Sequence, residues 1–140
     1  MGLLLDTMVA SELRKARHRS TDPNFAAWSE SVRLDDAYLS VVTVYEMERG
    51  VLLIKRKDPA SAAIYRTWLD DLEDAFRGRI LQLTIQSAKF SAAFQVPVTA
   101  PFADSLIAGI AKENDLTIAT RNTADFARFQ VPLLNPWEPA

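Results

Sequence analysis

The chain has 140 residues, a formal net charge of −2 and no Cys. This length fits one domain, expected to span residues 1–140, with a core that needs no disulfide bonds. The absence of Cys excludes disulfides, thiolate zinc sites and a Cys nucleophile. No stretch approaches the roughly 18 apolar residues of a membrane span, and Asp6 interrupts the first apolar run. We therefore expect a cytoplasmic protein that does not enter the membrane.

The first half of the chain alternates short apolar strands with helices. Residues 3–6 form a buried strand, because three leucines run without alternation before Asp6. Thr7 is placed to cap a helix that runs to about residue 16. After a polar loop, residues 24–34 show helical spacing of apolar side chains. A second strand, residues 38–40, leads into a strongly apolar helix over residues 42–56.

The second half of the chain repeats this alternation. Pro59 suits the first position of a helix, Gly78 ends that helix, and Thr84 is placed to cap the next one. Pro132 cannot donate to a strand ladder, so the last strand is expected at an edge. The expected elements are helices at 59–76, 85–94 and 102–114, strands at 80–83, 116–119 and 131–134, and a helical turn at 122–126.

Strands that alternate with helices predict an α/β fold. We expect three α/β/α layers with a mostly parallel central sheet of about five strands. In such folds, sites form outside the carboxyl ends of the strands. Side chains that follow strands or begin helices are therefore the candidates for function.

Four acidic residues occupy such positions: Asp6, Glu46, Asp104 and Asp125. Asp104 and Asp125 each fall near a helix start, where a carboxylate also suits the helix dipole. Glu46 lies among apolar residues, with Arg49 one turn away as an alternative partner. Asp6 is harder to explain as a cap, because the next residue, Thr7, is the better candidate.

Taken together, these four acids predict a metal site. Carboxylates gathered at one sheet edge repel each other unless a cation, shared protons or arginine partners compensate their charge. Mg²⁺ or Mn²⁺ accepts oxygen ligands, retains several waters and contacts phosphate oxygens. Such an ion activates water for attack on a phosphodiester, and this chemistry needs neither His nor Cys.

Several short motifs resemble one family along nearly the whole chain. They are Leu4-Leu5-Asp6-Thr7, residues 40–46 (SVVTVYE), residues 102–108 (FADSLIA), residues 120–126 (TRNTADF) and residues 131–137 (VPLLNPW). In order and spacing they resemble PIN-domain ribonucleases, and more closely the VapC and FitB-like toxins of bacterial toxin–antitoxin pairs. One position departs from the family, which usually has Asn where this chain has Met8.

The resemblance implies a function and a site. Asp6, Glu46, Asp104 and Asp125 correspond to the acidic metal-binding set, and our hypothesis makes Asp6 and Asp104 the principal ligands. The implied activity is Mg²⁺-dependent cleavage of RNA, with Mn²⁺ as a possible substitute. The implied partners are a small antitoxin, which blocks the site with an Arg or an apolar helix, and a second copy of the chain. The other residues expected at the site, in supporting or substrate-binding roles, are Thr7, Thr120, Arg121 and Asn122.

Further roles follow as hypotheses. Glu46 and Asp125 are expected to orient the attacking water, one of them as general base. Arg14, Lys15 or Arg121 is expected to hold the RNA backbone. Met8 cannot replace the hydrogen bonds of an Asn amide, so activity below the family's norm is expected.

Three other functions fit parts of the same pattern. An aspartate-based phosphatase would use Asp6 as nucleophile, but it needs a second Asp at the position of Met8. A catalytically weak or inactive module would bind RNA or an antitoxin without cleavage. A toxin–antitoxin complex that represses transcription is compatible with nuclease activity, because there the antitoxin contacts the DNA.

Two surface features remain open at this stage. The basic clusters at 14–19 and 55–57 suit solvated helix ends as well as contacts with phosphates. The helix at 42–56 is apolar around most of its circumference, which indicates deep burial or an interface. We expect a homodimer interface near its C-terminal half, with a plain core position as the alternative.

Overall fold

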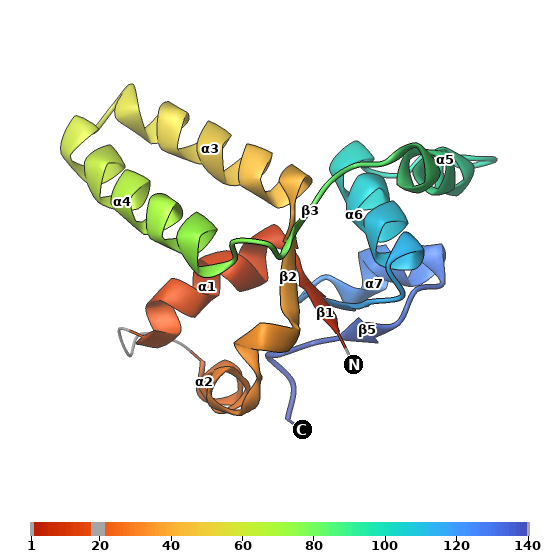
Figure 1. The fold of residues 1–140 in the computed structure, drawn as a ribbon, viewed down its shortest axis with the longest axis horizontal. Coiled ribbons are helices and arrows are strands. Elements are labelled where there is room, and N and C mark those ends of the chain that lie inside the picture. Colours follow the sequence, from red (N-terminus) through yellow and green to blue (C-terminus); the bar gives the residue numbers. More distant parts are fainter. Residues whose placement is uncertain (1, 18–21, 140) are drawn as a thin grey trace.

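The computed structural model describes residues 2–17 and 22–139, without the side chains of residues 14–17. Its centre is a five-stranded parallel sheet with the order β3-β2-β1-β4-β5 (Figure 1). The strands are β1 (Leu3–Leu5), β2 (Ala37–Ser40), β3 (Ile80–Leu81), β4 (Thr117–Ala119) and β5 (Leu133–Leu134). The predicted sheet is confirmed, and β5 lies at an edge as Pro132 requires.

Helices connect the strands, as the alternating pattern predicts. They are α1 (Thr7–Arg17), α2 (Pro23–Ser31), α3 (Val41–Lys55), α4 (Pro59–Ala75), α5 (Ile85–Phe94), α6 (Phe102–Glu113) and α7 (Thr123–Phe126). Two short 3₁₀ turns, Leu34–Asp36 and Ala127–Phe129, were not predicted. No helix in the described ranges is both long enough and apolar enough to cross a membrane.

Local sequence signals set the helix starts. Asp22 and Asp58 cap α2 and α4 through their carboxylates, each with a Pro at the next position. Thr84 and Ser87 form a reciprocal capping box at α5. Gly78 follows α4 with a φ of 82°, a conformation in which a side chain is strained.

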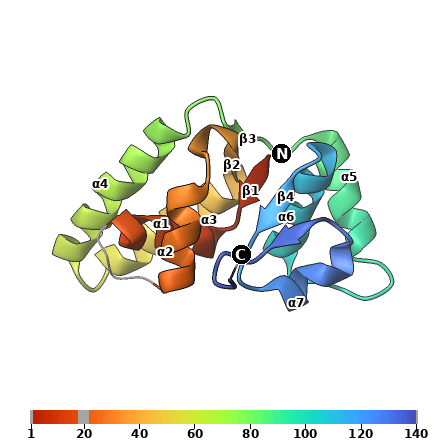
Figure 2. The same ribbon diagram turned by 90° about the horizontal axis from the view of Figure 1, so that it is seen from below.

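The helices cover both faces of the sheet. In Figures 1 and 2, α1–α4 lie on one side of the strands and α5–α7 on the other. The buried side chains divide in the same way, because successive residues of a strand point to opposite faces. Leu5 packs in the cluster with Val9 and Leu72, whereas Leu4 packs in the cluster with Ile107 and Phe126. The three-layer α/β/α architecture is confirmed.

The strand order places a crevice beside β1. From β1 the chain passes to β2 and β3 on one side, and then returns to β4 on the other side. This reversal of direction is where open parallel sheets form sites, outside the carboxyl ends of the strands. Leu5 pairs with Ala119, so the residues that leave these strands, Asp6 and Thr120, emerge side by side.

Candidate metal centre and active site

Asp6 joins the sheet to α1 and uses both of its carboxylate oxygens. Its N–H still donates to Ala119 in the ladder at 3.1 Å, while its carbonyl accepts from the Ala10 N–H at 3.0 Å. Oδ1 accepts from the Val9 N–H at 2.9 Å, which caps the helix. The expectation that Thr7 caps α1 is therefore wrong, because Asp6 already stands where strand turns into helix. Asp6 is 6% exposed.

Thr120 holds the second oxygen of Asp6. The Thr120 hydroxyl donates to Asp6 Oδ2 across the β1–β4 junction and accepts from the Asn122 N–H at 3.0 Å. Thr120 is fully buried, so both bonds lie out of bulk water. One hydroxyl thus fixes the acid and the chain that leads into α7. This agrees with the place predicted for Thr120 beside the acids.

Glu46 faces α1. Ser40 caps α3 by accepting from the Thr43 N–H at 3.1 Å, and this sets the rotation of the helix. Glu46, in the second turn, accepts a hydrogen bond from the Thr7 hydroxyl at 2.5 Å. The structure therefore pairs Glu46 with Thr7 rather than with Arg49, the alternative partner on its own helix.

Asp104 lies in the first turn of α6, which a polar cluster holds in place. The hydroxyl of the neighbouring Ser105 lies 2.8 Å from the Ser91 hydroxyl and accepts from Gln95 Nε2 at 3.0 Å. Further along, α6 approaches α5 so closely that a Cβ on Gly109 would stand 2.4 Å from the Ser87 carbonyl oxygen. These contacts fix α6 against α5 and thereby the position of Asp104.

An open cavity of about 420 Å³ brings three of the four predicted acids together. It is lined by Asp6, Glu46 and Asp104, by Thr7, Met8 and Asn122, and by Ser11, Glu12 and Ile107. Sequence reasoning missed the last three. Ser11 lies one helical turn after Thr7, so the helical spacing of α1 was the signal that could have found it.

Asp125 lies outside this lining. It is exposed in the first turn of α7, and its backbone N–H donates to the Asn122 carbonyl at 3.1 Å. Its charge nevertheless contributes to raising the pKa of Asp104. Asp125 is thus an electrostatic neighbour of the cavity rather than part of its wall.

The environment of this cavity disfavours the charged forms of Asp6 and Asp104. Burial raises the pKa of Asp6 above its usual range, the bonds from Thr120 and Val9 oppose this, and the charge of Glu46 adds to it. Burial also raises the pKa of Asp104, as do the charges of Glu46, Asp125 and Asp6. The described lining residues include no Lys or Arg. Within that lining, no cationic side chain compensates the carboxylates.

The donor set fits a hydrated hard cation. Within the described ranges, no three acidic side chains converge closely enough to enclose an ion by themselves. Mg²⁺ does not need such a cage, since it retains waters and is commonly bound through one or two carboxylates. Asp6 and Asp104 supply oxygen ligands of the right chemistry, and each Asp6 oxygen keeps a lone pair beyond its hydrogen bond.

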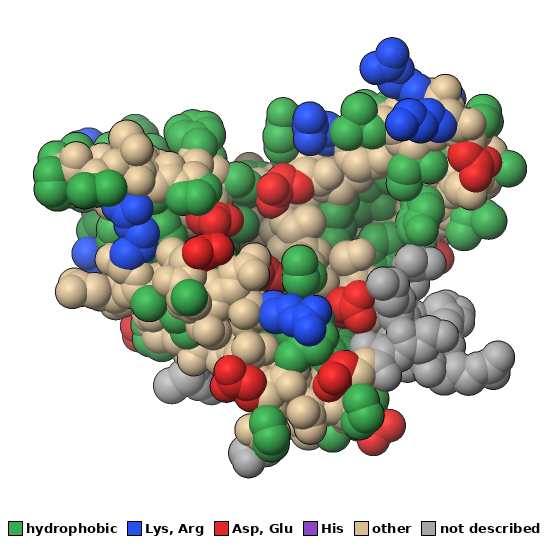
Figure 3. All heavy atoms as spheres, turned by 180° about the vertical axis from the view of Figure 1, so that it is seen from behind, with side chains coloured by type: hydrophobic (Ala, Val, Ile, Leu, Met, Phe, Trp, Pro, Cys, Tyr) green, Lys and Arg blue, Asp and Glu red, His purple; other side chains and the backbone are tan. Residues whose placement is uncertain are grey.

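The described basic residues lie outside the lining of the cavity. Arg121 is exposed at the end of β4, with its guanidinium carbon 5.1 Å from the centre of the Trp137 ring. Lys55, Arg56 and Lys57 are exposed at the turn between α3 and α4. On the face seen in Figure 3, acidic side chains lie in the middle with a basic side chain among them, and further basic side chains lie at the tip of that helical hairpin. The side chains of Arg14 and Lys15 lie outside the described residues.

Comparison with known proteins agrees with this site. Residues 3–131 match the PIN domain. The chain is 33% identical over 145 residues to Toxin FitB of Neisseria gonorrhoeae (strain ATCC 700825 / FA 1090), covering 96% of this chain and 98% of FitB. It is 30% identical over 147 residues to VapC ribonuclease Y4jK of Sinorhizobium fredii (strain NBRC 101917 / NGR234), covering 99% of each.

A solved structure gives the same result. The crystal structure of FitAcB from Neisseria gonorrhoeae superposes with a TM-score of 0.85 at 33% identity, covering 97% of this chain and 99% of that chain. The protein belongs to the PIN-domain family. The resemblance to the VapC and FitB branch, which the five motifs indicate, is confirmed.

Proposed function

We propose that this protein is a metal-dependent endoribonuclease and the toxin of a toxin–antitoxin pair. The observation that carries the proposal is the group of carboxylates at the β1–β4 crevice, where Asp6 and Asp104 both have raised pKa values. Burial raises both pKa values, the charges of neighbouring carboxylates add to this, and such an environment suits a cation site. Relatives named as a toxin and as a VapC ribonuclease support the same conclusion.

Each acid has a distinct role in the proposed reaction. Asp6 and Asp104 would hold the metal, directly or through water, because both line the cavity and burial raises the pKa of both. When bound, Mg²⁺ supplies Lewis-acid chemistry by activating water and neutralising charge that develops on the phosphodiester. Glu46 and Asp125 orient the attacking water, with Glu46 better placed to act as base because it lines the cavity. Thr7 and Thr120 fix the geometry of Glu46 and Asp6.

An RNA cleavage assay tests the proposal. Purified protein with Mg²⁺ or Mn²⁺ is expected to cut RNA internally, and EDTA is expected to stop the reaction. Asp6→Asn should abolish cleavage, while the same change at the exposed Asp71 on α4 should leave it intact. Full cleavage by Asp6→Asn, or cleavage unaffected by EDTA, would contradict the assignment. RNA binding without cleavage would favour the inactive binding module.

The antitoxin is proposed to dock in a groove that joins the acid cavity. This groove, about 320 Å³ in volume, lies between α1, α3 and α4. Its apolar lining includes Val51, Ile54 and Leu69, and its polar end is Thr7 and Ser11, which also line the acid cavity. An apolar helix in the groove would therefore lead the antitoxin chain into the site.

Gly50 offers a direct test of this docking. Gly50 lines the groove, and a Cβ at this position meets no atom within 4 Å, so the backbone there accepts a side chain. Gly50→Phe should prevent copurification with the co-expressed antitoxin, while RNA cleavage persists. Gly50→Ala is the matched control and should retain the complex. Normal complex formation by Gly50→Phe would place the antitoxin elsewhere.

A homodimer is proposed through the outer side of α3. Met47 and Val51 are buried, whereas Tyr45 and Leu52 are 66% and 53% exposed on the other side of the helix. Helices with apolar side chains on both sides are typical of interfaces. Leu52→Glu should convert a dimer into a monomer when molar mass is measured in solution. A monomeric wild type would contradict the proposal.

A further inference from the structure

Arg121 is flanked in the chain by two residues of the acid site but does not pair with the acids. It follows Thr120, which donates to Asp6, and it precedes Asn122, which lines the acid cavity. Within the described residues, no ion pair joins Arg121 to a carboxylate. Its recorded contact is with the face of the Trp137 ring. An aromatic ring, not an acid, therefore holds this cation.

Trp137 is itself fixed by contacts that do not involve Arg121. Its carbonyl accepts from Asn24 Nδ2 at 3.0 Å, and its N–H donates to Asn135 Oδ1 at 2.9 Å. Its ring centre lies 4.7 Å from that of Phe25, which is fully buried. The C-terminal segment is thus fastened to α2, and the indole is a rigid platform.

The platform has an electrostatic consequence. A guanidinium on a flexible stem, attached one residue from Thr120, is attracted to the carboxylates of the cavity. Among them it would neutralise the charge that binds a divalent cation. Over the Trp137 ring, it keeps its charge near the site while the acids remain available. Cation–π attraction to Trp is the strongest of the aromatic side chains.

We propose that Trp137 is a positioning residue that holds Arg121 off the metal-binding carboxylates and presents it to a phosphate of the RNA. The claim that Arg121 contacts RNA rests on the proposed nuclease function. The claim that Trp137 keeps Arg121 off the carboxylates rests only on the contact between Arg121 and the Trp137 ring. Trp137 touches neither metal nor RNA, so its effect passes entirely through Arg121.

Two measurements test these two claims separately: the affinity for Mn²⁺ without RNA tests the effect on the carboxylates, and the KM for RNA at saturating Mg²⁺ tests the contact with RNA. Trp137→Leu should weaken Mn²⁺ binding and raise KM, each about two- to fivefold, with kcat unchanged. Arg121→Gln should raise KM, leave Mn²⁺ binding at least as tight as in wild type, and lower the salt slope of RNA binding by about one. The double variant should regain wild-type Mn²⁺ affinity and keep the raised KM.

Two further variants control for lost packing. Trp28 packs on Phe25 with ring centres 5.3 Å apart, in the same aromatic group as Trp137. Trp28→Leu should therefore leave both readouts unchanged. Trp137→Phe keeps a ring against Phe25 with weaker cation affinity, so it should shift both readouts in the same direction as Trp137→Leu but less.

The outcomes are distinct. Equal loss of Mn²⁺ affinity in Trp137→Leu and in the double variant would show a merely structural role and overturn the inference. So would unchanged Mn²⁺ affinity and KM in both Trp137 variants. If wild type binds Mn²⁺ but cuts no RNA, the proposed function fails. The double-variant test of Mn²⁺ binding would still decide the positioning role.

Discussion

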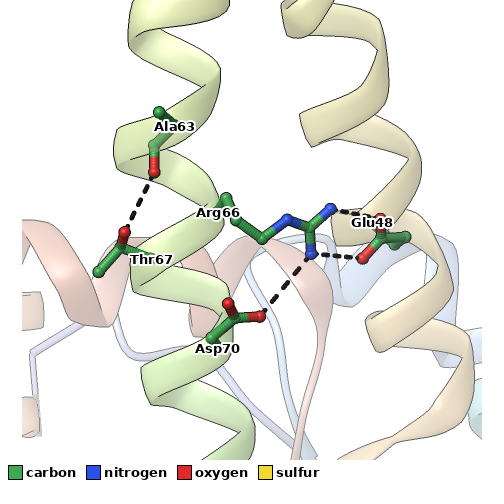
Figure 4. A network of polar contacts seen from close by, with 5 residues as sticks. All are labelled: Glu48, Ala63, Arg66, Thr67 and Asp70. Carbon is green, nitrogen blue, oxygen red and sulfur yellow. Dashed lines mark hydrogen bonds and ion pairs between the residues drawn. The ribbon is translucent and has the colours of Figure 1, made fainter.

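Two groups of charged residues in this protein follow opposite rules. On the α3–α4 hairpin, Glu48 accepts hydrogen bonds from both terminal nitrogens of Arg66, and Asp70 lies 3.8 Å from Arg66 (Figure 4). The bonds from Arg66 lower the pKa of Glu48. In the cavity at the end of the sheet, burial and like charges raise the pKa of Asp6 and of Asp104.

The difference separates structural from functional carboxylates. The hairpin acids are half-exposed, are paired with a cation and hold two helices together. In the cavity, Asp6 is buried, and the acids lack a cationic partner among the described lining residues, although the fold fixes Asp6 with several hydrogen bonds. A protein that holds unpaired carboxylates rigidly loses stability, and a bound cation would restore it.

The largest expected effect is on catalysis. Asp104→Asn should lower RNA cleavage by at least about 100-fold, because it removes a ligand for the ion that stabilises charge in the transition state. Glu48→Gln, a matched loss of one negative charge, should leave cleavage unchanged. Initial rates at saturating Mg²⁺ measure both. Similar losses in the two variants would erase the distinction between the regions.

The second effect is on thermal stability: the substitution that lowers activity should raise the melting temperature. Without divalent ions, Asp104→Asn should raise the melting temperature by about 2–4 °C, because it removes the cost of burying the Asp104 charge and relieves its repulsion by the neighbouring acids. Differential scanning fluorimetry in EDTA measures this shift. A lower melting temperature would mean that the Asp104 charge stabilises the fold.

The third effect is on the pH dependence of this gain. The folded-state pKa of Asp104 is raised above its ordinary value of 3.8, so as pH falls the folded protein takes up the proton first. The stability of the wild type therefore rises relative to that of Asp104→Asn as pH falls through the raised pKa. This relative gain is lost again as pH rises. The difference between the two melting temperatures should narrow toward acid pH. A widening gap would contradict the sign.

The smallest effect concerns the hairpin. Glu48→Gln should lower the melting temperature by less than Asp104→Asn raises it, because half-exposed ion pairs contribute little. The pKa of Glu48 is lowered in the folded protein, so the stability that its ion pair contributes is present at neutral pH and disappears as pH falls through the acidic range. High salt should also reduce it. A loss larger than the gain from Asp104→Asn would reverse the ranking.

The spacing of apolar residues, together with residues that start or end helices and strands, was enough to predict the layers, the parallel sheet and the edge position of β5. Prolines, glycines and capping residues carry this information locally, as Thr84 and Gly78 illustrate. The convergence of Asp6, Glu46 and Asp104 also followed, because parallel strands end at one edge.

Contacts that depend on register and helix rotation could not be predicted. The bond from Thr120 to Asp6 requires Leu5 to pair with Ala119, and a one-residue shift would break it. Asp6 rather than Thr7 caps α1 because β1 ends at Leu5, and a strand longer by one residue would move the cap to Thr7. The Arg66–Glu48 pair spans two helices whose relative rotation no local signal specifies.

The most direct test of cation compensation is the stabilisation that a divalent ion gives to the folded protein. Mn²⁺ should raise the melting temperature of the wild type in a concentration-dependent way, since it binds the folded state alone. Asp104→Asn should show a much smaller rise at every concentration, and Glu48→Gln a rise equal to that of the wild type. Equal stabilisation of all three proteins, or none of the wild type, would contradict a cation site among these carboxylates.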